Sequence, residues 1–432
     1  MNANFTSVTQ SQPQARRKPR FALWALITLL FLSACTPVAL PESWAGITAD
    51  GPLENGRYNA RYIYVAYRDV VFRVDLKRDA GGRELEEGQL AGDRLVDWAA
   101  KAANGGLMFA APTIIRRNEQ TLVFVGSYNH SIYAFSPDVG TRNQPLSNWS
   151  APPGTDKVVA NAITNTDLLY VGQGDKGIRA YDLTTGQLRH EFKDMEFGVW
   201  ATPVLDSATE TLYVAAKDQY LYALNAEDLS LLWRVKVGGA MAAQPLLREG
   251  VLFVGTFTGE VVAIDVSGNS NQPADDQQDR ILRRFKTENG GWVWSTPIYD
   301  EGYLYFGDLK GYLYKIDAET FNLAWRVRDE EHPGGIRGNV AVAEGAERKL
   351  VIAGSESKHV RAYDAETGSV VWTSTAETER ILSDVIVIGD DVIISTMNPE
   401  RLVVALSIHT GARNWSLKKP SQEDVDRLVR AP

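Results

Sequence analysis

The sequence predicts an all-β protein, an eight-bladed β-propeller of four-stranded antiparallel blades. The first observation is a short apolar run that ends in a small residue and recurs at intervals of about 40 to 60 residues. The second is that each run precedes another rich in Tyr, Ala and aliphatic residues, as a β-hairpin requires. Closing eight such sheets into a ring covers both faces of every inner strand. The eight runs are Tyr64–Ala66, Phe124–Gly126, Tyr170–Gly172, Tyr213–Ala215, Phe253–Gly255, Tyr305–Gly307, Ile352–Gly354 and Ile393–Ser395.

One module shows its four predicted strands with particular clarity. Tyr303–Gly307 and Tyr312–Asp317 are dense in aromatic and apolar residues, and the tight turn Asp308–Gly311 separates them. Leu323–Val327 follows a polar turn, and Ser295–Ile298 lies upstream. Together these runs predict one antiparallel sheet, which alone would leave an apolar face in water.

The predicted fourth strands carry a tryptophan in six modules. We interpret these side chains as packing between neighbouring blades. The third and fifth modules have His190 and Phe285 at this place. The six are Trp98, Trp149, Trp233, Trp325, Trp372 and Trp415.

Residues 1–34 are typical of a lipoprotein signal peptide. A basic cluster, Arg16–Arg20, precedes the apolar run Phe21–Leu32, which is too short to span about 30 Å of hydrocarbon as a helix. Small residues then lead to Cys35, the only Cys of the chain. This arrangement resembles a bacterial lipobox, in which the Cys becomes the lipid-modified first residue. An uncleaved membrane anchor is the alternative, and the short run argues against it.

The charge balance predicts an acidic domain after the signal peptide. The chain has 45 Lys and Arg against 54 Asp and Glu, and residues 1–34 hold four basic residues and no acidic one. The remainder therefore has a net charge of about −13, which argues against binding to nucleic acid or to anionic lipid. We expect a lipid anchor at the cell membrane or the outer membrane, with the domain in the extracytoplasmic space. With Cys35 lipidated, no disulfide can form in the domain.

The domain boundaries follow from the repeat. Residues 35–43 are expected to form a lipidated tether and residues 44–419 the propeller. Each blade is expected to contain all of its own strands. Alternatively, Val38–Leu40 joins the outer edge of the last blade and closes the ring. Residues 420–432 are expected to form a polar tail with a frayed end.

The residues at or just before each first strand form a candidate binding surface. Trp44–Thr48 aligns with the segments that begin at Trp200 and Trp294. Radial symmetry places the equivalents in one ring near a mouth of the central channel. Aromatic residues, Met and Arg are enriched at protein interfaces, so the ring is either a rim for an extended peptide or partner loop, or a plug that packs the blades. Exposed outer strands also offer edges to which a partner strand can add. The ring comprises Trp44, Phe109, Val159, Trp200, Ala242, Trp294, Ile336 and Ile381, flanked by Met108, Met241, Trp292, Arg337 and Arg380.

The repeat resembles that of the quinoprotein-type (PQQ-like) β-propellers. The pattern Leu-Tyr-Val-Gly, then Leu-Tyr-Ala-Leu-Asp, then Thr-Gly and a Trp recurs along the chain. With the lipobox and eight blades, the chain is similar to the BamB-like lipoproteins over nearly all of its exported part. This resemblance implies a non-enzymatic scaffold that binds envelope proteins of the machinery inserting β-barrels into outer membranes. Clear copies are Leu169–Gly172 with Thr185-Gly186, Leu212–Ala215 with Leu221–Asn225 and Trp233, and Val351–Gly354 with Ala362–Asp364, Thr367-Gly368 and Trp372.

Enzymatic relatives of this repeat bind pyrroloquinoline quinone over a calcium ion, and many use an adjacent-Cys disulfide that this chain cannot form. A calcium site needs several converging oxygen ligands, whereas the inner strands here start with Trp, Phe, Val, Ile and Ala. The five His residues lack paired metal-binding spacing. His332 lies beside Glu330 and Glu331, which could form a weak metal site, but we interpret this stretch as a solvated loop. We therefore expect no catalytic, cofactor-binding or metal-binding residues.

Two functions stay open. The first is a monomeric, membrane-tethered scaffold for envelope proteins. The second is an extracytoplasmic module that binds or senses a small ligand or glycan. An open apolar surface at the mouth of the ring would favour a protein partner, and a closed polar pocket would favour a small ligand.

Overall fold

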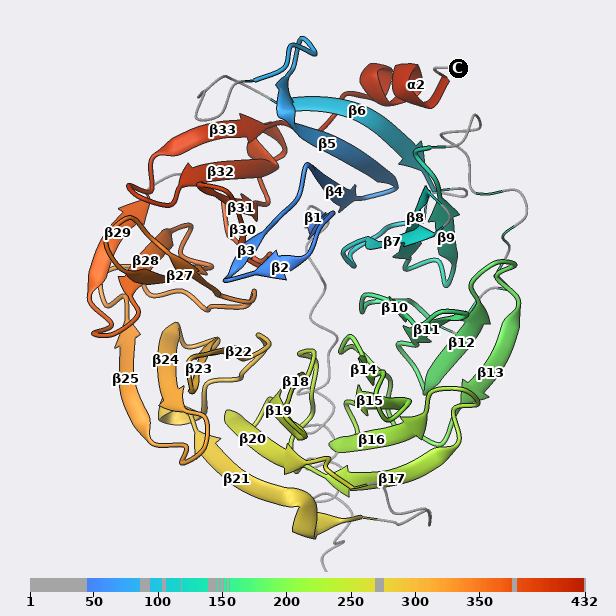
Figure 1. The fold of residues 1–432 in the computed structure, drawn as a ribbon, viewed down its shortest axis with the longest axis vertical. Coiled ribbons are helices and arrows are strands. Elements are labelled where there is room, and N and C mark those ends of the chain that lie inside the picture. Colours follow the sequence, from blue (N-terminus) through green and yellow to red (C-terminus); the bar gives the residue numbers. More distant parts are fainter. Residues whose placement is uncertain are drawn as a thin grey trace, which may run out of the picture. The chain divides into compact units, whose positions relative to one another are not determined.

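Strands dominate the described part of the chain, and they form eight antiparallel blades arranged around an axis, with one further two-stranded sheet (Figure 1). This computed structural model describes residues 45–430 without 86–93, 103–105, 118, 139–145, 147–148, 150, 153, 155, 269–275 and 375–378. The predicted all-β, eight-bladed propeller is confirmed. The predicted signal peptide and tether, with Cys35, and the ring residue Trp44 lie outside the described residues.

Each of blades 1 to 4 comes from one continuous stretch of chain, with its first strand innermost (Figure 1). Blade 2 has three strands among the described residues, and Trp149 lies where the fourth is predicted. The strands of these blades are β1 (Ala45–Ala49), β4 (Tyr62–Tyr67), β5 (Val70–Asp79) and β6 (Arg94–Lys101); β7 (Thr113–Arg117), β8 (Gln120–Gly126) and β9 (Ile132–Phe135); β10 (Ile163–Thr164), β11 (Leu168–Gly172), β12 (Ile178–Asp182) and β13 (Leu188–Phe192); β14 (Val204–Asp206), β15 (Thr211–Ala215), β16 (Tyr220–Asn225) and β17 (Leu231–Lys236).

Blades 5 to 8 each have four strands in the same order. They are β18 (Leu246–Arg248), β19 (Val251–Gly255), β20 (Glu260–Asp265) and β21 (Ile281–Lys286); β22 (Ile298–Asp300), β23 (Tyr303–Gly307), β24 (Tyr312–Asp317) and β25 (Leu323–Arg328); β26 (Ala341–Glu344), β27 (Lys349–Gly354), β28 (Val360–Asp364) and β29 (Val370–Ser374); β30 (Ile386–Ile388), β31 (Asp391–Ser395), β32 (Val403–Ser407) and β33 (Arg413–Leu417). Short 3-10 helices are η2 (Gln278–Arg280), η3 (Glu288–Gly290) and η4 (Pro399–Arg401).

Blade 6 shows how the sequence sets the strands. β23 and β24 have the predicted bounds, and they pair with Leu304 opposite Ile316. The innermost strand β22 begins only at Ile298, because Pro297 has no N–H group to donate to a ladder. Gly311 has a φ of +84° and completes the turn between β23 and β24.

The small residue that ends a second strand makes room for the next blade. A Cβ added to Gly307 would lie 2.3 Å from Ile336 Cγ2, and one added to Gly255 would lie 2.6 Å from Val293 Cγ1. The Ile336 N–H also donates to the carbonyl oxygen of Asp308, at 2.9 Å. Each new blade therefore attaches to the end of the preceding second strand.

Fourth-strand tryptophans pack against the next blade, which confirms their predicted role. Trp372 Nε1 in blade 7 donates to the carbonyl oxygen of Ile408 in blade 8, at 2.7 Å. Trp325 Nε1 makes the equivalent bond to Ala365, at 3.2 Å. A Cβ added to Gly411 would lie 2.4 Å from Trp372 Cε3. The glycine of the Thr-Gly turn thus provides a flat surface for the indole of the preceding blade.

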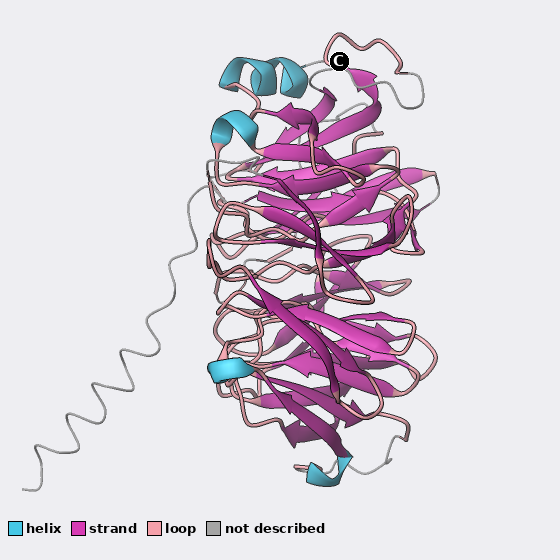
Figure 2. Ribbon diagram, turned by 90° about the vertical axis from the view of Figure 1, so that its left-hand side faces the viewer, coloured by secondary structure: helices cyan, strands magenta, loops and turns pink. Residues whose placement is uncertain are grey.

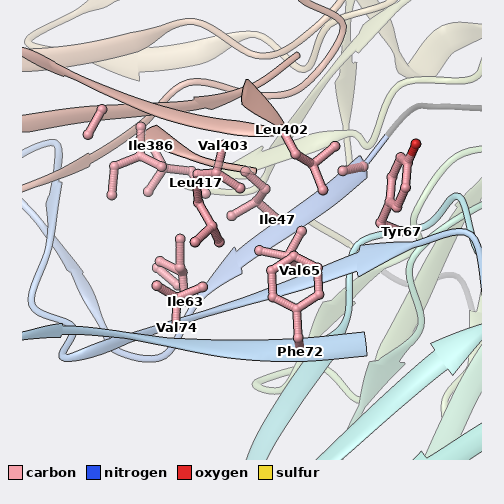
Figure 3. Packing of buried hydrophobic residues seen from close by; sticks show 14 of the residues in the cluster. Ile47, Ile63, Val65, Tyr67, Phe72, Val74, Ile386, Leu402, Val403 and Leu417 are labelled. Carbon is pink, nitrogen blue, oxygen red and sulfur yellow. The ribbon is translucent and has the colours of Figure 1, made fainter. Parts of the chain in front are cut away.

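Side chains of blades 1 and 8 close the ring. Ile63 and Val65 from blade 1 share one buried cluster with Ile386 and Val403 from blade 8 (Figure 3). The Ser395 hydroxyl donates to the carbonyl oxygen of Ala45, at 2.8 Å. Both blades contain their own four strands, as predicted. The alternative closing segment, residues 38–40, lies outside the described residues.

A hairpin inserted between the first two strands of blade 1 reinforces this closure. Its strands, β2 (Leu53–Glu54) and β3 (Arg57–Tyr58), lie near the centre of Figure 1, beside β30. Arg57 donates to the carbonyl oxygens of Glu344 and Gly389, and its guanidinium lies 3.1 Å from a carboxylate oxygen of Asp390. One side chain of blade 1 therefore binds blades 7 and 8 together.

The C-terminal segment folds into a helix, so the expectation of a frayed tail is wrong over Gln422–Arg430. This helix, α2, lies beside β6 (Figure 1). The Asp424 N–H donates to Ser421 Oγ at 3.0 Å, which caps the helix. Val425 is buried, and Leu428 packs on the cluster shared by blades 1 and 8, which explains the order. Across the described residues, no helix combines the length and the apolar character that crossing a membrane requires.

Candidate functional site

The predicted ring lies on one face of the propeller. Seen from the edge, the strands cross the thickness of the ring and the loops lie on its two faces (Figure 2). The antiparallel order puts the connection from each fourth strand to the next blade on the same face as the loop between second and third strands. We call this side the aromatic face, after Trp200, Phe257, Trp292, Trp294 and Arg337.

Backbone hydrogen bonds that repeat at each blade junction set the equivalent positions. Val199, before Trp200, donates its N–H to the carbonyl oxygen of Gln173 at 2.8 Å. Val293, before Trp294, makes the same bond to Thr256 at 3.0 Å. These valines point inward and are fully buried. The residue after the inward-pointing one, such as Trp200 or Trp294, therefore occupies the ring position of its blade.

This register corrects two members of the predicted ring. Ile336 and Ile381 make the inward-pointing bond, to Asp308 and Ser355, and are only 4% and 1% exposed. Their alignment in the ring is therefore one residue off, because blades 7 and 8 lack the Thr-Pro pair that anchors the alignment after Trp200 and Trp294. The ring equivalents in these blades are Arg337 and Leu382.

Four aromatic rings from blades 4 to 6 form a continuous layer on the aromatic face. Phe257 stacks between Trp292 and Trp294, with both pairs of ring centroids 4.8 Å apart. Trp200 lies 6.4 Å from Trp294. Trp292 leaves 40% of its surface exposed. Phe257 was not predicted to belong to this surface. The sequence feature that could have indicated it is an apolar residue within the polar turn 256–259.

Two cations lie over this layer. Lys217 Nζ is 4.0 Å from the ring centroid of Trp200, and the guanidinium carbon of Arg337 is 4.5 Å from that of Trp294. Burial lowers the pKa of Arg337, and the charge of Arg380 acts in the same direction, while that of Glu356 opposes it. The aromatic faces supply part of the stabilisation that these cations lose on leaving water.

Two buried donors in the layer have no hydrogen-bond partner among the residues that the structure describes. They are Nε1 of Trp200 and Nε of Arg337. The nearest carboxylate oxygen to Arg337 Nε, on Glu356, is 3.8 Å away, which is too long for a hydrogen bond. Buried donors left unpaired cost about 1–3 kcal/mol each.

The structure does not bring every predicted residue into the layer. Phe109 is buried and pairs with Tyr128 in blade 2, with centroids 4.4 Å apart. Arg380 is exposed at the start of blade 8. The part of the ring that forms a continuous surface is therefore the arc over blades 4 to 7.

Comparison with known protein families gives one match that covers more than half of the chain. The model described as "Outer membrane protein assembly factor BamB" matches residues 178–272 and 282–422. These two segments contain Trp200, Phe257, Trp292, Trp294 and Arg337. The aromatic face thus lies within the matched region.

Curated relatives match shorter parts. The outer membrane protein assembly factor BamB of Nitrosomonas eutropha is 30% identical over 175 residues, which cover 40% of this chain and 38% of that protein. A quinohemoprotein alcohol dehydrogenase of Pseudomonas putida is 27% identical over 164 residues, covering 35% of this chain and 22% of that protein. The chain thus spans less than two fifths of the length of either relative.

Solved structures match the fold more completely. BamB from Moraxella catarrhalis has a TM-score of 0.59 and 12% identity, over 83% of this chain and 96% of that one. The computationally designed protein Ika8 has a TM-score of 0.56 and 15% identity, over 79% of this chain and 92% of that one. At these identities the likeness concerns the fold alone.

Proposed function

The chain belongs to the family of the outer membrane protein assembly factor BamB, and from this membership we propose that it is a non-enzymatic scaffold that binds a protein partner through the aromatic face. The observation that carries the proposal is the layer of Trp200, Phe257, Trp292 and Trp294, of which Trp292 is 40% exposed. Trp, Tyr and Arg dominate the energetics of protein interfaces. The proposed partner is an envelope protein of the barrel-assembly machinery.

The shape of the layer supports a protein partner over a small ligand or glycan. Trp292 is 40% exposed and extends the layer outward, where a partner loop can cover it. An open aromatic surface matches the centre of a protein interface.

The residues on this face also argue against quinone-dependent dehydrogenase activity, which the name of the Pseudomonas relative suggests for that protein. A calcium ion under a quinone requires several converging oxygen ligands. The described residues of the aromatic layer are instead aromatic and cationic, and Lys217 and Arg337 would repel a divalent cation. We propose that this chain performs no redox chemistry here.

We further propose that lipid on Cys35 tethers the domain to the outer membrane, where barrel assembly takes place. The sequence supports this through the apolar run Phe21–Leu32 and the small residues before Cys35. Several acyl chains on one residue give stable anchoring, which a single short chain does not. The net negative charge makes electrostatic binding to anionic lipid a poor substitute.

Site-specific crosslinking in intact envelopes tests the partner. A photoreactive residue replaces Trp292, and a matched control replaces Leu53, which is 57% exposed in the hairpin on the opposite face. We expect crosslinks to an envelope protein from position 292 and not from position 53. Crosslinks only to the chain itself, or equal yields at both positions, would contradict the proposal.

A further inference from the structure

Two loops at the junction of blades 6 and 7 bring Asp329, His332 and His359 together. Asp329 and His332 follow β25, and His359 precedes β28. One potential ligand atom from each residue lies within 4.8 Å of the other two. The imidazole centroids are 4.7 Å apart. The interpretation of His332 as a member of a solvated loop beside Glu330 and Glu331 therefore misses its neighbours, which belong to a different part of the sequence.

A small cavity lies among these side chains. Its volume is about 20 Å³, and Asp329, His332 and His359 line it together with Ser355, Tyr363 and Arg361, whose charge is paired with Asp329. One water molecule needs about 10–15 Å³ of such space, and a divalent transition-metal ion is no larger than a water molecule. The cavity thus has the size of a single-ion site, and its walls carry nitrogen and oxygen donors.

The carboxylate of Asp329 is held in place. It accepts the backbone N–H of Glu331 at 3.1 Å and that of His332 at 3.0 Å, both through Oδ1. Its other oxygen, Oδ2, lies 3.7 Å from His332 Nδ1 and also pairs with Arg361. A carboxylate offers about four lone-pair sites. The ion pair with Arg361 therefore leaves Oδ2 a site for a metal and keeps the carboxylate neutralised in the metal-free protein.

The two imidazoles are suited to ligation in different ways. His359 Nδ1 lies 3.2 Å from Ser357 Oγ, and this hydrogen bond orients the ring, as an outer-shell partner does for a metal-bound histidine. Burial, with the charges of His332 and Arg361, lowers the pKa of His359. His332 is half exposed, so its ring can turn toward the ion.

We propose that Asp329, His332 and His359 bind a divalent transition-metal ion such as Zn²⁺, with water in the remaining positions. Two imidazoles and one carboxylate form a donor set that Zn²⁺ accepts in proteins. The ion would join the connection between blades 6 and 7 to the loop that precedes β28. Arg337 lies in the same connection, so bound metal would stiffen this side of the aromatic face.

Metal titration of the full chain tests the site. The protein is treated with EDTA, freed of the chelator and titrated with Zn²⁺ by calorimetry, and with Co²⁺ by visible absorption. We expect one equivalent to bind to the natural chain and about 100-fold weaker binding in His332→Ala and in His359→Ala. His409→Ala is the matched control, because it removes a histidine from blade 8, where the imidazole pairs with Asp390. This control is expected to bind as tightly as the natural chain.

Thermal unfolding of the metal-free variants separates loss of the site from loss of the fold. His332 is half exposed, so metal-free His332→Ala is expected to melt at the same temperature as the metal-free natural chain. Added Zn²⁺ should then raise the melting temperature of the natural chain and not that of the variant. The proposal is overturned if the natural chain binds no Zn²⁺, or if folded His332→Ala binds it as tightly as the natural chain.

Discussion

Replacing Trp292 with Ala removes the exposed end of the aromatic layer. A Trp side chain offers roughly 250 Å² of surface. With 40% of it exposed, about 100 Å² remains for a partner to cover. At about 25 cal/mol per Å², this area is worth about 2.5 kcal/mol. Loss of that contribution weakens binding roughly 60-fold.

The assay uses the partner protein that the crosslinking experiment identifies. It measures how much of this protein binds as the concentration of the purified chain is varied. Trp292→Ala also removes stacking on Phe257, which lowers the free energy of unfolding by about 0.5–1.5 kcal/mol, in addition to the lost burial. Trp325→Ala is the matched control, because it deletes a partly buried indole from the outer strand of blade 6, away from the aromatic face. The reasoning fails if Trp292→Ala binds as the natural chain does, or if Trp325→Ala weakens binding equally.

Three further predictions concern the fold and its anchor. Gly411→Ala is expected to lower the free energy of unfolding by about 1–3 kcal/mol more than Gly302→Ala, because both glycines have positive φ but only the first added Cβ meets a neighbouring ring; equal melting temperatures would contradict this. Cys35→Ala is expected to release the domain from membranes without changing its melting temperature, and continued tight membrane association in fractionation would count against the lipid tether. The Arg189 guanidinium lowers the pKa of Asp182 to about 2. The contribution of ionised Asp182 to the free energy of unfolding is therefore complete above the unfolded pKa near 3.8, and it is lost as the pH falls through 2. Acid unfolding curves of Asp182→Asn should lack this loss, and curves parallel to those of the natural chain would show that the ion pair contributes nothing.

Much of the fold was predictable because it repeats. The blades repeat one strand pattern, with a fourth strand described in every blade but blade 2. The strong module at residues 303–317 therefore identifies weaker copies elsewhere, and the bounds of β23 and β24 agree with the sequence. The fourth-strand tryptophans were also recognisable, because a Trp recurs at the same place in six modules. The order of α2 was missed, since it depends on Val425 and Leu428 meeting a surface formed by blades at opposite ends of the chain.

The candidate site was only partly predictable, for reasons of register and distance. Trp200 and Trp294 share a Thr-Pro pair that fixes their alignment, whereas blades 7 and 8 lack it, and a shift of one residue exchanges Ile336 for Arg337. The pairing of His332 with His359 depends on two loops that only the radial arrangement brings together. Local spacing carries no sign of such a pair.

The seam between blades 1 and 8 has a consequence for how the chain is made. The apolar partners of Ile63 and Val65 lie on blade 8, near the other end of the sequence. During synthesis the side of blade 1 that contacts blade 8 therefore stays exposed until blade 8 has been made. Exposed strands of this kind are prone to aggregate. The newly made chain therefore depends most on a chaperone before blade 8 has been made, because the apolar side of blade 1 is still exposed.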